Sequence, residues 1–198
     1  MGLYNAEISA GSLMLPESRR IAKLLLSQPT KEQWVEALKV DNVLQKKTPA
    51  TAKRQARLIR NRLDTLEDEA WSMIASGSQE VATQILFAAA LKHSKVLADF
   101  LHDVYFGHLR RLEKHLSPAK DWESFMAECV QRVPEIARFS DTTRAKMLQV
   151  LIRILAEGKF IDSTKTFRIT PPHLHPDVVG YLKRHSETAV LSLMDIPQ

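Results

Sequence analysis

Cysteine is almost absent from this chain, with a single residue, Cys129, among 198. One thiol cannot form an intramolecular disulfide or a cysteine-based metal cluster, and its place in a helical apolar pattern predicts a buried structural thiol. Glycine is also scarce, with six residues, while hydrophobic residues make up 44% of the sequence. This composition suits a helical globular protein and is too apolar for a disordered chain.

Long apolar segments are missing as well. The longest uninterrupted apolar run extends only from Ile85 to Leu91, far below the ~20 residues that span a bilayer. The N-terminus has no charged segment followed by an apolar stretch and a cleavage site, so no secretion signal is expected. We therefore expect a soluble protein of the reducing cytoplasm that does not enter a membrane.

The motifs of common enzymes are absent too. The sequence contains no GxxxxGK[ST], GxGxxG, GxSxG, HExxH or CxxC pattern. The pair His102-Asp103 has no third partner placed by sequence, and such pairs arise by chance in a chain with seven histidines. His173 and His175 flank one residue, but no carboxylate cluster or cysteine pair lies nearby, which favours solvated loop histidines. We expect no catalysis, no metal and no cofactor.

A dense block of positive charge is the main feature that the sequence does have. Seven basic residues and no acid lie between Lys46 and Arg62. Without these seven, the net charge of +5 would become −2, so this block determines the basic balance of the chain. Acidic residues resume at Asp64 and end the block abruptly.

The same block has the pattern of an amphipathic helix that ends near Leu66. Thr48 can cap its first turn with a hydroxyl, and Pro49 suits the first helical position, where no backbone donor is needed. At 100° per residue, an apolar arc of roughly 80° lies opposite a polar arc of roughly 120°. The apolar arc contains Ala52, Ala56, Ile59, Leu63 and Leu66, and the polar arc contains Lys53, Arg54, Arg57, Arg60 and Asn61.

A preceding helix completes a helix-turn-helix layout. Thr30 and Gln33 form a capping box that predicts a helix through about Val40, and residues 41–47 connect it to the basic helix. In this layout the second helix enters the DNA major groove with its N-terminal residues toward base edges. The connection is longer than the tight turn of the motif and has no glycine, although a short extra turn of helix could fill it.

Duplex DNA is the partner that the basic helix favours, because clustered lysine and arginine release counterions from DNA. Alternatives remain open: a solvated surface face, or a protein-interaction scaffold whose basic face binds an acidic partner. RNA binding is less favoured, since few aromatic residues lie near the basic face to stack on single-stranded bases. A membrane-surface helix is disfavoured because the apolar edge is small and has neither Trp nor Phe.

The N-terminal and middle regions predict further helices. An irregular arm over residues 1–15 is expected to tuck its apolar side chains against the body, before a helix from Pro16 to Ser27. The apolar middle, residues 67–116, has its central helix from Ser78 to about Tyr105, with a break near His93–Ser94. The apolar residues of the arm are Leu3, Tyr4, Ile8, Leu13, Met14 and Leu15.

The C-terminal part loosely repeats the organisation of residues 30–66. Trp122 starts a helix, Pro134 starts a short one, and Ser140 caps a third that ends at Gly158. The third helix is apolar around most of its circumference, which predicts a core helix whose first turn could still touch DNA. The candidate contacts of that turn are Thr142, Thr143, Arg144 and Lys146.

The segment after this helix predicts a small β-hairpin of the winged-helix kind, formed by residues 160–162 and 166–169. Lys165 and Arg168 would then be wing contacts to DNA. A final helix from about Pro176 to Ser192 closes the chain. The organisation is therefore expected to comprise residues 1–77, 78–116 and 117–198 within one compact globule.

Four blocks follow one another along the chain and carry a family resemblance. They are LMLPESRRIAKLLL (Leu13–Leu26), NVLQKKTPATAKRQARLIRNRL (Asn42–Leu63), ATQILFAAALKHSKVLADFL (Ala82–Leu101) and ILAEGKFI (Ile154–Ile161). Together they resemble BrxA, the family of smallest core proteins of the bacteriophage exclusion (BREX) phage-defence systems. The resemblance covers nearly the whole chain and is thinnest after Pro171.

The resemblance implies an all-helical fold with two helix-turn-helix-like units and DNA binding without known catalysis. It also implies operation beside a methyltransferase and other BREX proteins that mark host DNA and restrict phage DNA. The Thr48–Leu63 block corresponds to the first unit and residues 140–155 to the second.

We therefore expect an all-α, compact multi-helix globule with two helix-turn-helix-like units and room for one short β-hairpin wing after the second. The leading hypothesis is a non-catalytic, double-stranded DNA-binding component of phage defence, monomeric when alone, with other BREX proteins as partners. Lys53, Arg57 and Arg60 should mainly contact phosphate, and Thr51, Arg54 and Asn61 are candidates for base edges. The candidate DNA contacts are Lys46, Lys47, Thr48, Thr51, Lys53, Arg54, Arg57, Arg60, Asn61, Thr142, Thr143, Arg144, Lys146, Lys165 and Arg168.

Overall fold

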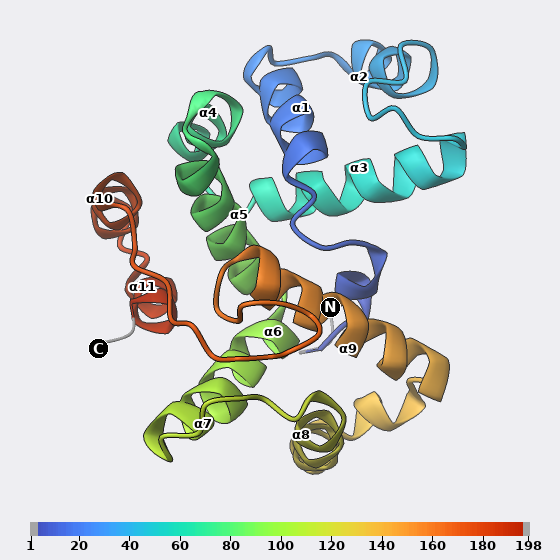
Figure 1. Ribbon diagram of the computed structural model, residues 1–198. Helices are drawn as coiled ribbons and strands as arrows, with labels where there is room; N and C mark the ends of the chain where they lie inside the picture. Colours follow the sequence, from blue (N-terminus) through green and yellow to red (C-terminus); the bar gives the residue numbers. More distant parts are fainter. Residues whose placement is uncertain (1–3, 196–198) are drawn as a thin grey trace.

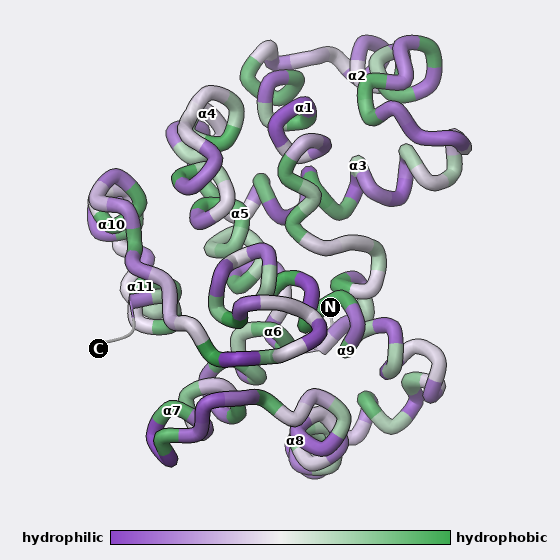
Figure 2. Tube along the Cα trace, in the orientation of Figure 1, coloured by the Kyte–Doolittle hydropathy of each residue, from purple (hydrophilic) through white to green (hydrophobic). Residues whose placement is uncertain are grey.

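Helix α5 (Gln79–His93) lies at the centre of the computed structural model, which describes residues 4–195 (Figure 1). Ser78 starts this helix by accepting a hydrogen bond from the Val81 amide at 3.1 Å. Every residue from Ile85 to Leu91 is buried, and Figure 2 shows this segment as predominantly hydrophobic. A helix that is apolar all round belongs inside a protein, and the other helices surround it.

The surrounding elements fall into three groups in Figure 1. A short 3-10 turn, η1 (Glu7–Ala10), precedes α1 (Leu15–Leu26), α2 (Lys31–Lys39), α3 (Pro49–Leu63) and α4 (Asp68–Ser76) around one end of α5. At the other end follow α6 (Lys95–Asp99), the π-helical turn η2 (Phe100–Tyr105), α7 (Phe106–Arg110), α8 (Pro118–Arg132), the 3-10 turn η3 (Pro134–Arg138) and α9 (Asp141–Glu157). Helices α10 (Pro176–Arg184) and α11 (Thr188–Met194) flank α5. The predicted all-α, compact fold is confirmed.

The break in the predicted central helix occurs where the sequence indicated. Helix α5 ends at His93, and the Ser94 side chain accepts a hydrogen bond from the Leu97 amide at 3.4 Å to start α6. After α6 the chain continues as the wider π-helical turn η2. Phe100 of this turn packs edge-on against Phe125 of α8, with 5.3 Å between ring centroids. The break therefore directs the chain onto α8.

The predicted single C-terminal helix is wrong, because the chain forms two helices there. Helix α10 ends at Arg184, and Ser186 adopts a left-handed φ of 56°. The Glu187 amide then donates to the Leu182 carbonyl at 2.8 Å, which closes α10 before α11 begins. Lys92 of α5 forms an ion pair with Glu187 and fixes this turn to the centre of the fold.

The predicted β-hairpin wing is reduced to isolated antiparallel bridges. Ile161 pairs with Ile169, and Arg168 pairs with His115, and within residues 4–195 neither pairing extends into a regular strand. The Asp162 side chain explains why. Its carboxylate accepts a hydrogen bond from the Arg168 amide at 3.0 Å, so it takes the backbone donor that would otherwise continue the ladder.

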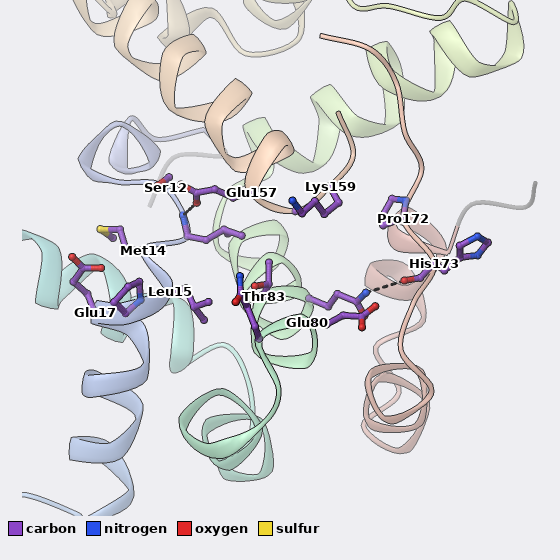
Figure 3. Close-up of a pocket in the computed structure, with 15 residues that line it drawn as sticks. Ser12, Met14, Leu15, Glu17, Glu80, Thr83, Glu157, Lys159, Pro172 and His173 are labelled. Atoms are coloured by element: carbon purple, nitrogen blue, oxygen red, sulfur yellow. Dashed lines mark hydrogen bonds between the residues drawn. The ribbon is translucent and has the colours of Figure 1, made fainter. Parts of the chain in front are cut away.

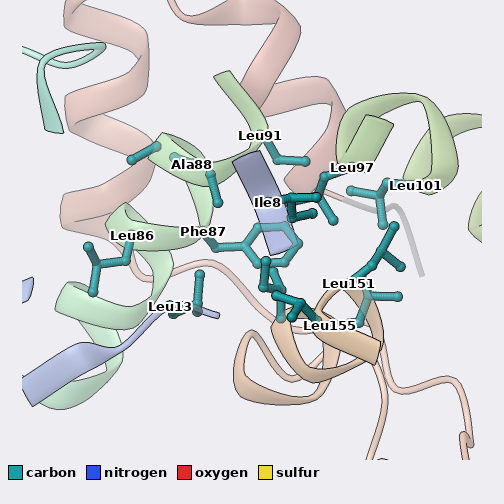
Figure 4. Packing of buried hydrophobic residues seen from close by; sticks show 14 of the residues in the cluster. Ile8, Leu13, Leu86, Phe87, Ala88, Leu91, Leu97, Leu101, Leu151 and Leu155 are labelled. Atoms are coloured by element: carbon teal, nitrogen blue, oxygen red, sulfur yellow. The ribbon is translucent and has the colours of Figure 1, made fainter. Parts of the chain in front are cut away.

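The N-terminal arm lies inside the fold, as predicted, and contributes to the core. Ile8 is fully buried and Leu13 is 2% exposed, whereas Leu3 lies outside the described residues. Figure 4 shows Ile8 and Leu13 beside Phe87 of α5 and close to Leu155 of α9. The arm therefore fills space between helices that are far apart in sequence.

Two buried or half-buried charged side chains hold the arm by its backbone. Arg62, near the end of α3, is 3% exposed and donates to the carbonyls of Gly11, at 3.0 Å, and Ser12. Glu157, at the end of α9, accepts hydrogen bonds from the Leu13 amide and the Ser12 hydroxyl, each at 2.8 Å. Burial lowers the pKa of Arg62 to about 10, so the guanidinium stays charged at neutral pH. The arm thus links α3 to α9 (Figure 1).

Replacement of Arg62 by Met should lower the free energy of unfolding by about 3 kcal/mol. The change removes a buried charge-assisted donor and leaves arm carbonyls without a partner. Urea denaturation followed by circular dichroism measures the loss. The matched change Arg57→Met, at an exposed position of the same helix, should cost no more than about 0.5 kcal/mol. Equal losses in the two variants would contradict this account of the arm.

The stability of the fold should also decrease as the pH is lowered, because of the titration of His93 of α5. Its Nε2 lies 3.0 Å from the Glu7 carboxylate. Burial, and then the charge of Arg62, lower the pKa of this histidine in the folded protein. The unfolded chain, with a histidine pKa of about 6.5, therefore binds the proton more readily, and unfolding becomes easier as the pH drops through that value. His93→Gln removes this titration. Urea denaturation gives the free energy of unfolding of the variant and the wild type at pH 7.5 and 5.5. Relative to the wild type, the variant should be more stable at pH 5.5 than at pH 7.5. A difference between the two proteins that does not change with pH would contradict the effect.

Candidate nucleic-acid interface

Helix α3 has the start and the two faces that the sequence predicted. The Thr48 hydroxyl accepts a hydrogen bond from the Thr51 amide at 3.2 Å, and Pro49 occupies the first helical position. All five residues of the apolar arc are buried, from Ala52 to Leu66. On the polar arc Asn61 is half-buried, and the four cations, Lys53, Arg54, Arg57 and Arg60, are exposed.

Four cations of the predicted block are exposed and free of internal pairing. Lys47, Lys53, Arg54 and Arg57 make no ion pair with a carboxylate in the described part of the chain. They lie from just before α3 to just beyond its midpoint, where the capped helix presents its polar arc to solvent. This is the part of the molecule best suited to meet an anionic partner.

The other three cations of the block are engaged within the protein. Lys46 pairs with Glu17 of α1 at 2.6 Å. The Arg60 guanidinium lies 4.9 Å from the centre of the Trp34 ring of α2 and 3.6 Å from the Asp64 carboxylate. Arg62, the third, is buried against the arm. The pattern of the block does not predict the contacts with Glu17, Trp34 and the arm, because these partners are remote along the chain.

The connection between α2 and α3 runs from residue 40 to residue 48, and the short extra turn of helix that could have filled it is not formed. Asn42 stabilises the connection instead. The Asn42 side chain accepts from the Lys46 amide at 3.0 Å and donates to the Lys46 carbonyl at 3.1 Å. Leu44 is 1% exposed and ties the connection to the core. The loop is therefore ordered but longer than the tight turn of a helix-turn-helix.

The predicted contacts at the start of α9 divide into exposed and internally bonded residues. Thr142 and Lys146 are exposed, and Thr143 is half-buried behind the Ser140 cap. The Arg144 guanidinium donates to the Ile136 and Ala137 carbonyls at 3.3 and 3.4 Å. Arg144 therefore holds η3 against α9.

Two further candidates lie on the turn after α9. Lys165 is exposed at its tip, and Arg168 is exposed with its Nε 3.4 Å from the Asp162 carboxylate. In Figure 1, α3 and α9 both begin toward the same side of the molecule, with the arm between them. The fifteen candidate residues thus fall in two groups, one on α3 and its approach and one on α9 and the following turn.

A cavity of about 950 Å³ opens elsewhere, between the beginnings of α1 and α5, the end of α9 and residues 172–173 (Figure 3). Its charged side chains are mainly acidic: Glu17, Glu80 and Glu157 line it together with Lys159. Two of these carboxylates are already bound, Glu17 by Lys46 and Glu157 by the arm. Such a lining does not suit a phosphate group.

The described histidines, cysteine and acidic residues contain no group of three or more placed to hold a metal ion. His175 has a local structural role, because its Nδ1 accepts a hydrogen bond from the Asp177 amide at 3.2 Å at the start of α10. Gln84 of α5 bonds the same segment through its side chain, to the His173 carbonyl at 2.9 Å and the His175 amide at 2.8 Å. These contacts fix the segment that leads into α10.

Fold and site together describe an all-α protein with one exposed cationic helix, in which no described helix has both the length and the apolar character to cross a membrane. A family model named BrxA matches residues 2–186. The chain is 42% identical to "BREX protein BrxA" of Paramagnetospirillum magneticum (strain ATCC 700264 / AMB-1), over 98% of this chain and 96% of that protein. It is 38% identical to "BREX protein BrxA" of Escherichia coli O9:H4 (strain HS), over 96% and 88%.

A solved structure agrees with the sequence relatives. The crystal structure of an uncharacterized protein from Magnetospirillum magneticum matches with a TM-score of 0.90 and 40% identity, over 98% of this chain and 99% of that chain. The chain belongs to the BrxA family of BREX phage-defence proteins. The resemblance carried by the four sequence blocks is thereby confirmed.

The cap at Thr48 should determine how firmly α3 begins. Thr48→Ala removes the side-chain acceptor for the Thr51 amide and should lower the free energy of unfolding by about 1 kcal/mol. Thr48→Ser keeps the acceptor and should stay close to wild type. Thermal or urea denaturation of the two variants gives the comparison. If the serine variant lost as much stability as the alanine variant, the hydroxyl cap would not be the stabilising contact.

Proposed function

We propose that this protein is a non-catalytic, double-stranded DNA-binding component of BREX phage defence, and that the exposed face of α3 is its main DNA contact. The observation that carries the proposal is the set of four exposed cations at Lys47, Lys53, Arg54 and Arg57, which make no ion pair within residues 4–195. No ion pair among these described residues has to break before the four side chains meet phosphates. Their binding would release counterions condensed on the duplex, which favours association at low salt.

The other candidates on α3 follow from their environment. Arg60 is about half exposed, and its pair with Asp64 is long and solvent-screened, so exchanging that carboxylate for a phosphate costs little. Lys46 already has a close partner in Glu17 and would contribute less. Thr51 and Asn61, both half-buried on the side of the polar arc, remain candidates for base edges.

A second, weaker contact is proposed at α9 and the turn that follows it. Lys146 and Lys165 are exposed cations, and Thr142 adds an exposed hydroxyl at the start of the helix. Arg168 has an exposed guanidinium with only a long contact to Asp162. These residues would extend the footprint on DNA, whereas Arg144 would act by positioning η3.

Other BREX proteins are proposed as partners, and one observation favours a protein-interaction role as a second candidate function. Val40, directly after the last residue of α2, is 74% exposed, and Val35 within α2 is 45% exposed. Two large apolar side chains on one helical segment suit a protein partner. A protein-interaction scaffold would show weak, salt-labile DNA binding without preference between duplex and single strand, together with co-purification of a BREX subunit.

The test is the salt dependence of binding to a 20-base-pair duplex, and to single-stranded DNA and RNA of equal length, by fluorescence anisotropy. Changing Lys47, Lys53 and Arg57 together to Gln should flatten the plot of log affinity against log salt by about 2.7, since each lost phosphate contact removes ~0.9. The control changes Arg110, Lys114 and Lys120 to Gln, which alters the net charge equally on α7, α8 and their connection. Equal slopes in the two variants would remove α3 from the interface.

A further inference from the structure

A notch of about 300 Å³ lies between the N-terminal arm and α3. Arg54 and Arg57 line one side of it, Glu7 and Ser9 of η1 line the other, and Leu58 contributes apolar surface. The notch adjoins the polar arc of α3, yet one of its walls comes from a segment some 45 residues earlier in the sequence. The arm therefore creates a recess beside the cationic face of α3, which the helix alone would not have.

The two arginines are arranged for a shared anion. They are three residues apart, so their side chains project from adjacent turns of the same helix face. Both are exposed, and neither makes an ion pair in the described part of the chain. Each guanidinium is a planar fork whose N–H groups match two oxygens of a phosphate, a geometry that a lysine ammonium cannot reproduce.

The acid that lines the notch is engaged elsewhere. The Glu7 carboxylate lies 3.0 Å from His93 Nε2 of α5, and within residues 4–195 it forms no ion pair with Arg54 or Arg57. Neither arginine is therefore ion-paired with the acidic residue that borders the same notch. An anion from outside the molecule is the group that would complete the site.

The wall formed by the arm is held in place before any ligand arrives. Ile8 is fully buried beneath it, and Arg62 binds the carbonyls of Gly11 and Ser12 just beyond it. The Ser9 amide also donates to the Ala6 carbonyl at 3.0 Å within η1. A preformed wall avoids the cost of ordering a loop on binding, which raises affinity for a ligand of matching shape.

We propose that this notch binds one phosphate of the DNA backbone, held by the guanidinium groups of Arg54 and Arg57 with the Ser9 hydroxyl as a further donor. The inference rests on the proposed function and deepens it. Arg54 is thereby assigned to the backbone instead of a base edge. The N-terminal arm becomes part of the interface, and the phosphate in the notch sets the register of α3 on the duplex.

The experiment replaces both arginines by lysine, which keeps the charge and removes the planar forks. For Arg54→Lys/Arg57→Lys, affinity for a 20-base-pair duplex should fall about tenfold, while the slope of log affinity against log salt should stay within about 0.5 of wild type. The control Arg110→Lys/Arg184→Lys, at two exposed arginines of α7 and α10, should bind as wild type. Duplex affinity equal to wild type in the notch variant would overturn the proposal.

A second variant tests the notch by a change that should raise the affinity for duplex DNA. Glu7→Gln keeps an acceptor for His93 and removes the negative charge that borders the site, so duplex affinity should rise severalfold in the wild-type arginine background. In the Arg54→Lys/Arg57→Lys background the gain should be smaller, because the phosphate is no longer held in the notch. Equal gains in both backgrounds would show a general charge effect and overturn the site.

Titration with inorganic phosphate distinguishes a phosphate of the DNA backbone from a free phosphate ion as the ligand of the notch. Millimolar phosphate should displace the duplex no better than an equal ionic strength of chloride if the notch is built for a backbone phosphate. Strong displacement by phosphate would reassign the notch to a free anion and overturn the assignment to DNA. Failure of the wild-type protein to bind duplex would defeat the proposed function itself, whereas duplex binding unaffected by the lysine variant defeats only the notch.

Discussion

The burial of one guanidinium, that of Arg62, is the constraint on which the arrangement of this protein depends. A charge removed from water is tolerated only where hydrogen bonds replace the lost hydration, and Arg62 finds them in the carbonyls of Gly11 and Ser12. Those carbonyls, inside the protein and outside any helix, need donors as much as Arg62 needs acceptors. Each group therefore offsets the desolvation of the other. Glu157 repeats the arrangement from α9, taking the Leu13 amide, and the arm becomes the link between the two halves of the molecule.

This link also determines how α3 is presented. Its last turn is fixed by Arg62 and by the Trp71 indole, which donates to the Leu63 carbonyl at 2.9 Å. Its N-terminal part carries the Thr48 cap and, between Lys47 and Arg57, the four cations that make no ion pair among the described residues. A helix held at its end and exposed at its start can offer its N-terminal residues to a groove without bending or fraying. The arm that anchors α3 also provides, through Ser9 and its neighbours, one wall of the arginine notch. Structural anchoring and the proposed recognition thus use the same segment.

Local signals in the sequence predicted much of the fold. The Thr48 cap, the capping box at Thr30 and the break at Ser94 all involve groups within four residues of each other, and the two arcs of α3 follow from helical spacing alone. The failures involve either remote partners or single hydrogen bonds. Arg62 looked like one more cation because the arm that buries it lies about 50 residues away. The wing was lost to one carboxylate–amide bond at Asp162, and the last helix was divided by the Glu187 amide. Periodicity describes a face but does not say which distant segment covers it.

Contacts within the protein reduce the number of readily available cations in the block from seven to four, and they confine these four to one face of α3 and its approach. Two acids near that face are paired with cations of the same block, Glu17 with Lys46 and Asp64 with Arg60. The contacts that withdraw these two cations from the interface therefore also offset two carboxylates that would oppose a polyanion. What remains is a cluster of four exposed cations on α3 and its approach, and such clustering steers an anionic partner more effectively than net charge alone. A chain of only modest overall charge can in this way support a directed electrostatic contact.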